Sequence, residues 1–317
     1  MRQAAFRSYA FHIAVIAALF LLQYVLPAYH IGTFTRIMVY AVLAIGYNIL
    51  FGYTGLMSLG HAMFFAAGAY GAGLSVYWLG FGPIAALLAG VASAFVVSLL
   101  AGIVVLRVSG VAFLIVTLML AQAAFLATLY FNTITLGDQG IVLSLRPIEM
   151  AGLSFALSDP SVKYNVALAA FAFALLFSLW LLRSPFGRIL IAVRENEART
   201  KLLGYNTFLY RFWALVISGT LSGLSGALYC LLFAYVGASF ASLQYSTLPL
   251  LYTLLGGTGV TLGPLAGTAI MYYLIDISSS FTSSYMIIVG AALLVITLWF
   301  PEGIGGWVRR FLRRKPA

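Results

Sequence analysis

The feature that most restricts this chain is a succession of apolar stretches between Tyr9 and Phe300, most of them about 20 residues long. The hydrocarbon core of a bilayer is about 30 Å thick, and a helix needs about 20 residues to cross it. Backbone polar groups inside hydrocarbon must be bonded within the segment, which favours helices. We therefore predict an all-α polytopic membrane protein, organised as a single transmembrane domain over residues 1–317.

The apolar stretches predict about nine spans, with a range of about eight to ten. They cover residues 9–28, 37–51, 57–79, 83–106, 111–131, 164–182, 212–236, 246–262, 264–281 and 284–300. Either one stretch does not cross, or two short stretches form one broken span, so that both termini are cytoplasmic. Residues 183–211 then form a cytoplasmic loop, and residues 132–163 form a long external loop.

The composition excludes an ordinary soluble domain, because 63% of residues are hydrophobic and only 8% are charged. The net charge of +10 could indicate a nucleic-acid partner. In the predicted topology, however, nearly all basic residues fall on the cytoplasmic side, which is the positive-inside bias of a plasma-membrane protein. The exceptions are Arg36, Arg146 and Lys163. We therefore interpret the charge as a topology signal and expect no nucleic-acid partner.

The sequence lacks the residues that several functions require. None of the three lysines, Lys163, Lys201 and Lys315, follows the glycine-rich spacing of a phosphate-binding loop, so ATP hydrolysis by that route is not expected. The histidines are scattered and suggest no metal site. We expect neither an enzyme nor a cofactor in this chain. Asp276 is the only acid inside a predicted segment, which disfavours an ion-coupled carrier but leaves it and a passive channel as alternatives.

Two glycine-rich stretches interrupt the apolar pattern in similar ways. The candidate residues of the first are Gly52, Thr54, Gly55, Ser58, Gly60 and His61, and those of the second are Gly256, Gly257, Gly259, Gly263 and Pro264. Each stretch is followed by a run of small residues, which suggests a pseudo-repeat of two halves. Repeated glycine permits backbone shapes that a helix forbids.

Interrupted segments at matching places in two halves indicate the translocation pathway of a transporter. We therefore predict broken or re-entrant segments that line such a pathway. Close packing of helices through small residues is the alternative. For His61 beside the first break, the alternative to a pathway role is a hydrogen-bonded structural role.

The 183–211 loop predicts a polar helix that begins at Ser184-Pro185 and stops at Gly204. Glu195 precedes Arg199 by four residues, and Glu197 precedes Lys201 by four. Such pairs stabilise a helix by only about 0.2–0.5 kcal/mol each, too little to explain a long polar helix where a short turn would connect two spans. A docking surface for a cytoplasmic protein is the favoured explanation, and an interfacial helix is the alternative.

A set of motifs occurs in order over about residues 37–306. They are 52–55 with 58–61, 106–107 with 110 and 117, 184–188, 194–199, 203–204 with 206, 218–219 with 222–228, 255–257 with 263–264, and 300–304. Together they resemble the LivM-type permeases of branched-chain amino acid ABC importers. The resemblance implies a prokaryotic plasma (inner) membrane location. It also implies three kinds of partner, namely a second, LivH-like permease, two cytoplasmic ATPase subunits and a periplasmic or extracellular solute-binding protein.

By the same resemblance, residues 188–204 would form the helix that couples the permease to its ATPase. Its candidate coupling residues are Arg188, Arg194, Glu195, Asn196, Glu197, Arg199 and Gly204. The implied function is uptake of branched-chain or similar amino acids, driven by ATP hydrolysis in separate subunits. Related permeases serve urea and other small polar solutes, so the solute stays open.

Overall fold

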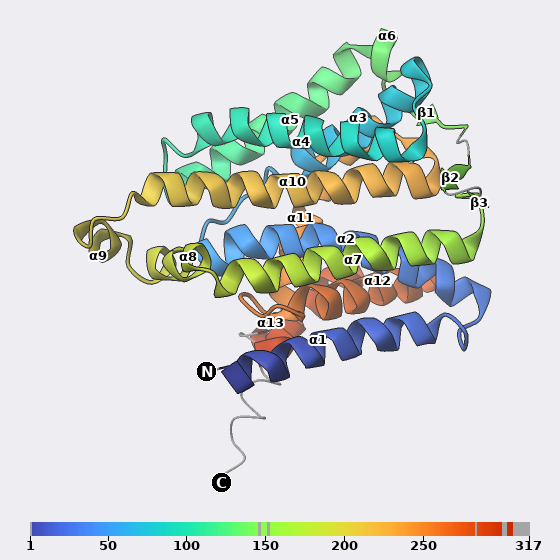
Figure 1. Ribbon diagram of the computed structural model, residues 1–317. Helices are drawn as coiled ribbons and strands as arrows, with labels where there is room; N and C mark the ends of the chain where they lie inside the picture. Colours follow the sequence, from blue (N-terminus) through green and yellow to red (C-terminus); the bar gives the residue numbers. More distant parts are fainter. Residues whose placement is uncertain (1, 145–146, 151–152, 283, 300–302, 307–317) are drawn as a thin grey trace.

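The computed structural model describes residues 2–144, 147–150, 153–282, 284–299 and 303–306. Helices make up nearly all of this part of the chain (Figure 1). The long helices are α1 (Arg2–Leu22), α2 (Ala28–Thr54), α3 (His61–Leu79), α4 (Pro83–Val105), α5 (Val111–Tyr130), α7 (Pro160–Arg183), α10 (Thr207–Phe233), α11 (Leu243–Gly256), α12 (Gly263–Phe281) and α13 (Tyr285–Trp299). The short elements are α6 (Asn132–Thr135), β1 (Ile141–Val142), β2 (Ile148–Met150), β3 (Leu153–Phe155), α8 (Pro185–Glu195), α9 (Glu197–Leu202), β4 (Tyr235–Val236) and the 3₁₀ turn η1 (Ala238–Ala241).

Six of the described helices are long and apolar enough to cross a membrane, namely α2, α3, α4, α5, α7 and α10. Each of the ten apolar stretches in the sequence nevertheless corresponds to a helix. The apolar part of α1 is shorter than a span, and α11 has only 14 residues. The all-helical, multi-pass character is therefore confirmed, whereas the count of about nine spans and the pseudo-repeat stay predictions.

Helix α2 forms the centre of the bundle. It contacts α7, α10, α11 and α12, and Figure 1 shows the axes of α2, α7 and α10 running in nearly the same direction across the view. Its side chains from Ile37 to Leu50 are almost entirely buried. The helix also extends beyond the predicted stretch 37–51, mainly at its start, where residues 28–36 are mostly exposed or half-buried.

Small residues allow α3, α4 and α10 to pack closely. A Cβ atom added to Gly68 of α3 would lie 1.9 Å from the carbonyl oxygen of Gly223 in α10. One added to Gly223 would lie 1.9 Å from the Cβ of Ala94 in α4. Backbones that approach this closely gain dispersion contacts, which are a main source of helix association where lipid offers no hydrophobic drive.

The two ends of the bundle carry different elements (Figure 1). At one end, α8 and α9 connect α7 to α10, so the predicted loop 183–211 reduces to residues 184–206 between helices. At the other end lie α6 and the short strands, where β1 pairs with β4 and β2 with β3, both antiparallel. The predicted external loop 132–163 therefore contains regular structure, and α7 already begins at Pro160.

Candidate functional site

The first glycine-rich stretch separates two helices. Helix α2 ends at Thr54, and Gly55 adopts a left-handed conformation with φ 75°. Residues 56–60 are irregular, and α3 begins at His61. The left-handed region is strained for a residue with a Cβ atom, so glycine is the natural residue at position 55.

Side chains from three places satisfy the backbone of this first break. The N–H groups of Leu59, Gly60 and Ala62 donate hydrogen bonds at 3.1, 3.1 and 3.2 Å to the hydroxyl oxygens of Thr117, Ser58 and Ser246, respectively. Thr117 belongs to α5 and Ser246 to α11. Because unpaired backbone groups are costly away from water, these hydroxyls allow an irregular segment to exist inside the bundle.

The second glycine-rich stretch is a break of the same kind. Helix α11 ends at Gly256, and α12 begins at Gly263 with Pro264 in its first turn. Between the helices, Gly257 and Gly259 have φ values of 101° and 74°. The positive φ values explain why this connection is rich in glycine.

The two breaks meet, and Asn48 of α2 joins them. Its Oδ1 accepts a hydrogen bond from the N–H of Gly259 at 2.9 Å, and its Nδ2 donates one to the carbonyl oxygen of Val260 at 3.1 Å. A Cβ atom added to Gly52 would lie 2.7 Å from the nitrogen of Gly259. The end of α2 and the α11–α12 connection are therefore in direct backbone contact.

Arg194 of α8 contacts both breaks. Its guanidinium donates a hydrogen bond to the carbonyl oxygen of Gly52. Cβ atoms added at Gly55 and Gly259 would each lie 3.3 Å from Arg194, from its Cγ and its Nη1 respectively. The side chain of Arg194 in α8 therefore lies where the two breaks meet. We call this place the break junction and define it as Asn48, Gly52, Gly55, Arg194 and Gly259.

Residues 184–206, which connect α7 to α10 and which we call the peripheral segment, form two helices. The sequence predicts a single helix for 184–204. Ser184 caps α8 by accepting a hydrogen bond from the N–H of Gly187 at 3.3 Å. Asn196 is extended, with φ −157°, and its side chain accepts a hydrogen bond from the N–H of Arg199 at 2.8 Å, which starts α9. The single-helix prediction is wrong because Asn196 acts as an N-cap. The expected Glu195–Arg199 pair is absent from the described residues, because Asn196 breaks the helix between them.

Glu197 attaches α9 to α10. Its carboxylate forms ion pairs with Lys201 at 3.0 Å and with Arg211 at 2.5 Å, and it accepts a hydrogen bond from Thr207 at 3.0 Å. Burial by itself raises the pKa of Glu197. The hydrogen bond from Lys201 and the charge of Arg211 outweigh this effect, so the pKa lies below the ordinary 4.5. Glu197 is thus engaged within the chain.

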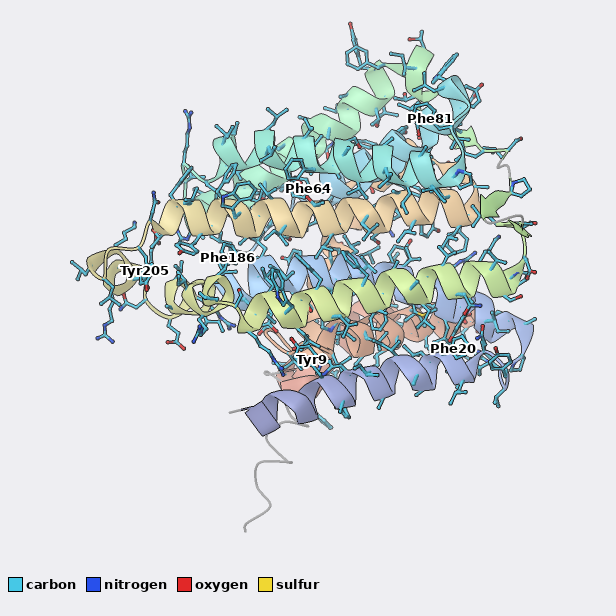
Figure 2. All side chains as sticks on the ribbon, in the orientation of Figure 1. Tyr9, Phe20, Phe64, Phe81, Phe186 and Tyr205 are labelled. Carbon is cyan, nitrogen blue, oxygen red and sulfur yellow. The ribbon has the colours of Figure 1, made fainter. Side chains whose placement is uncertain are left out.

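Most charged residues of the peripheral segment are exposed, and Arg194 is among them. Arg188, Glu195 and Arg199 are exposed, and Gly204 follows α9 with φ 87°. Next to them, Arg107, Lys201 and Arg211 line a groove of about 360 Å³. Figure 2 shows Tyr205 projecting at the α9 end, whereas Phe186 lies against the bundle with its ring 5.5 Å from that of Tyr210.

His61 is fully buried. Its Nε2 lies 2.9 Å from the hydroxyl oxygen of Ser218, which itself donates a hydrogen bond to the carbonyl oxygen of Gly46 at 2.6 Å. Because the serine proton is already used, Nε2 carries the histidine proton and donates it. The His61 ring is therefore hydrogen-bonded through Nε2, whereas its Nδ1 is buried without a partner among the described residues, and its pathway role stays a prediction.

The sequence analysis missed Asn48 and Ser246, and it included Thr117 and Ser218 only in motifs of the family resemblance, without their contacts to the first break. Asn48 carried a usable signal, since an amide is unusual in so apolar a run and polar groups inside a bilayer normally have partners. The hydroxyls carried little signal, because serine and threonine in a membrane helix commonly bond to their own preceding turn.

Broken helices that meet inside a membrane bundle are typical of the class of membrane transport proteins. Residues 29–298 match the family described as branched-chain amino acid transport system / permease component. The chain therefore belongs to the permease family of branched-chain amino acid ABC transporters.

Curated relatives agree with this assignment. The chain is 29% identical over 303 residues to the high-affinity branched-chain amino acid transport system permease protein LivM of Salmonella typhimurium, covering 89% of this chain and 71% of the relative. It is 28% identical over 307 residues to LivM of Escherichia coli, with the same coverage. It is 24% identical over 310 residues to the probable branched-chain amino acid transport permease protein LivM of Methanocaldococcus jannaschii, covering 84% and 90%. These relatives are named as permeases, which are transport components.

Proposed function

We propose that this chain is the permease subunit of an ATP-driven importer for branched-chain or similar amino acids. ATP hydrolysis takes place in two separate ATPase subunits, a second permease completes the pathway, and a binding protein delivers the solute. Both termini and the α8–α9 end face the cytoplasm. Support comes from the family, from the names of the relatives and from the positive-inside charge pattern.

The contact of Arg194 with both helix breaks is the observation that carries the coupling part of this proposal. A displacement of α8 by an ATPase would act directly on the carbonyl of Gly52 and on the loop that contains Gly259. Since Asn48 bonds the same loop, α2 and the α11–α12 connection would respond together. The outward residues Arg188, Glu195 and Arg199, with the adjacent groove, would form the docking surface.

The glycine breaks would line the pathway only after they separate. In the present conformation Thr54, Ser58, His61 and Gly256 are buried against protein. We propose that movement of α8 opens the break junction and creates a passage with little charge. Such a passage suits a zwitterion with an apolar side chain, although urea or another small polar solute fits a related importer.

An ion-coupled carrier is the rival function from a different class. Asp276 is its candidate carboxylate, and it accepts a hydrogen bond from the hydroxyl of Tyr29 at 2.5 Å. This bond gives Asp276 a structural partner between α2 and α12. We therefore favour the importer over the carrier and over a passive channel.

Reconstitution in liposomes tests the proposal. The complex of the two permeases, the ATPases and the binding protein should accumulate labelled leucine only when ATP is supplied to the ATPase side. Replacing the catalytic glutamate of the ATPase should abolish accumulation while the complex stays intact. Gradient-driven uptake by this chain alone would identify a carrier, and equilibration without accumulation would identify a channel.

A further inference from the structure

A cavity of about 390 Å³ lies between the first turns of α2 and α7, at the end of the bundle opposite α8 and α9. Phe233, at the end of α10, forms part of its wall. Gly32 of α2 also lines it, and a Cβ atom added there would meet nothing within 4 Å. The cavity is therefore open beside Gly32.

Two cations converge on this cavity from different helices. The guanidinium carbon of Arg36 lies 5.0 Å from the centre of the Phe233 ring, and Nζ of Lys163 lies 6.0 Å from the same centre. Both distances are within the range of cation–π contacts. Arg36 also donates a hydrogen bond to the hydroxyl of Tyr272 at 3.1 Å, which fixes its position.

No carboxylate lies within ion-pair distance of these cations in the described part of the chain. Neither Arg36 nor Lys163 forms an ion pair there. Two carboxylates adjoin the cavity and keep their negative charge, because their partners are neutral donors. Asp159 accepts bonds from Ser161, and Asp276 accepts the bond from Tyr29, which lines the cavity. The two positive charges repel each other unless an anion lies between them.

The predicted topology makes this pair unusual. Arg36 and Lys163 are two of the few basic residues that do not fall on the side where the others gather. Arg36 and Lys163, which are far apart in the sequence, thus place two positive charges in one cavity, on the side of the membrane where basic residues are rare. Both present N–H donors, which are the groups that bind phosphate and carboxylate oxygens.

We propose that this cavity is an oxyanion-binding site, which takes either the phosphate of a phospholipid headgroup or the carboxylate of an amino acid. The proposal is independent of the coupling to ATP hydrolysis, since binding to this end of the bundle needs no ATPase. Its test therefore fails or succeeds separately from the reconstitution experiment.

The purified full chain in neutral detergent would be titrated with two matched pairs of probes. The first pair is short-chain phosphatidylglycerol and diacylglycerol with the same two acyl chains, which lacks the phosphate, measured by native mass spectrometry. The second pair is leucine and leucinol, which lacks the carboxylate, measured by calorimetry. The site predicts preference for the oxyanion-bearing member of one pair.

Substitutions in the cavity test whether the preferred probe binds there. Arg36→Gln/Lys163→Gln should weaken binding of that probe about tenfold or more, because it removes two charged donors. Gly32→Leu should also weaken it by filling the open space without changing the charge. The matched control Arg107→Gln/Arg188→Gln removes two charges at the opposite end and should bind like the unaltered chain.

The probe that loses affinity identifies the source, with phosphatidylglycerol indicating lipid and leucine indicating the transported solute. Two results would overturn the proposal. One is equal binding of both members of each pair by the unaltered chain. The other is full binding by Arg36→Gln/Lys163→Gln or by Gly32→Leu, with thermal melting confirming that each variant is folded.

Discussion

The side-chain amide of Asn48 holds the backbone at Gly259, 211 residues away in the sequence, by accepting its N–H at 2.9 Å. The same amide donates to the next carbonyl, that of Val260, at 3.1 Å. Both hydrogen-bonding ends of one side chain are therefore used on one loop. As a result, we expect the two glycine-rich breaks to move together, although they belong to opposite halves of the chain.

Asn48→Leu should destabilise the protein and reduce transport. The substitution leaves the N–H of Gly259 and the carbonyl of Val260 without their partner. Both residues are half-buried, so the cost is at most about 1–3 kcal/mol for each group. Thermal melting in detergent and leucine uptake measure the two effects. Asn165→Leu is the matched control, because its amide bonds only to the carbonyl of Ser161 on the surface of α7. Equal melting and uptake for the two variants would contradict the assigned role.

Arg194→Gln should uncouple ATP hydrolysis from uptake. The variant loses a charged hydrogen bond to Gly52, worth about 1.5–3 kcal/mol, so transport should fall about tenfold or more. Recovery of the ATPase by co-purification should fall less than transport does, because the guanidinium of Arg194 bonds the carbonyl oxygen of Gly52 although the residue is exposed.

The control for Arg194→Gln is Arg188→Gln, which removes one positive charge from an exposed position of the same helix. It should reduce recovery of the ATPase more than Arg194→Gln does. If instead Arg194→Gln loses the ATPase while Arg188→Gln keeps it, Arg194 belongs to the docking surface and our assignment of the break junction is wrong.

The Glu197 ion pairs predict a stability change in acid. Because the folded state lowers the pKa of Glu197, ionised Glu197 stabilises the folded state fully above the ordinary pKa of 4.5. That contribution decreases as the pH falls from 4.5 through the lowered pKa and is lost below it. Glu197→Gln should therefore melt earlier than the unaltered chain at pH 7, and the difference should shrink below pH 4.5. A difference independent of pH would count against the ion pairs.

Two glycines of the second break should respond differently to alanine. At Gly256 a Cβ atom would lie 1.8 Å from the carbonyl oxygen of Gly263, so Gly256→Ala should reduce the yield of folded protein. At Gly259 the nearest atoms are 3.3 Å away, and the cost is the left-handed backbone at φ 74°, about 1–2 kcal/mol. Gly259→Ala should therefore fold yet transport poorly. Parallel loss of protein and activity in both variants would support close packing as the role of both glycines.

Much of the local structure could be predicted from the residues. The apolar stretches correspond to the long helices, Ser184-Pro185 begins α8, and both glycine-rich stretches separate helices. These features depend on neighbours within a turn or two. The break of the peripheral helix at Asn196 was missed because an asparagine is acceptable both inside a polar helix and as the cap of the next one.

The sequence by itself determined that the chain is a helical membrane protein with two irregular points, because hydrophobic length and glycine content act on each segment separately. Only the tertiary structure decided that those points touch, that Arg194 contacts both, and that Arg36 and Lys163 share one cavity. A polar group inside a bilayer must bond to another group of the protein. Which group becomes its partner depends on how the helices pack, and the sequence alone does not show this.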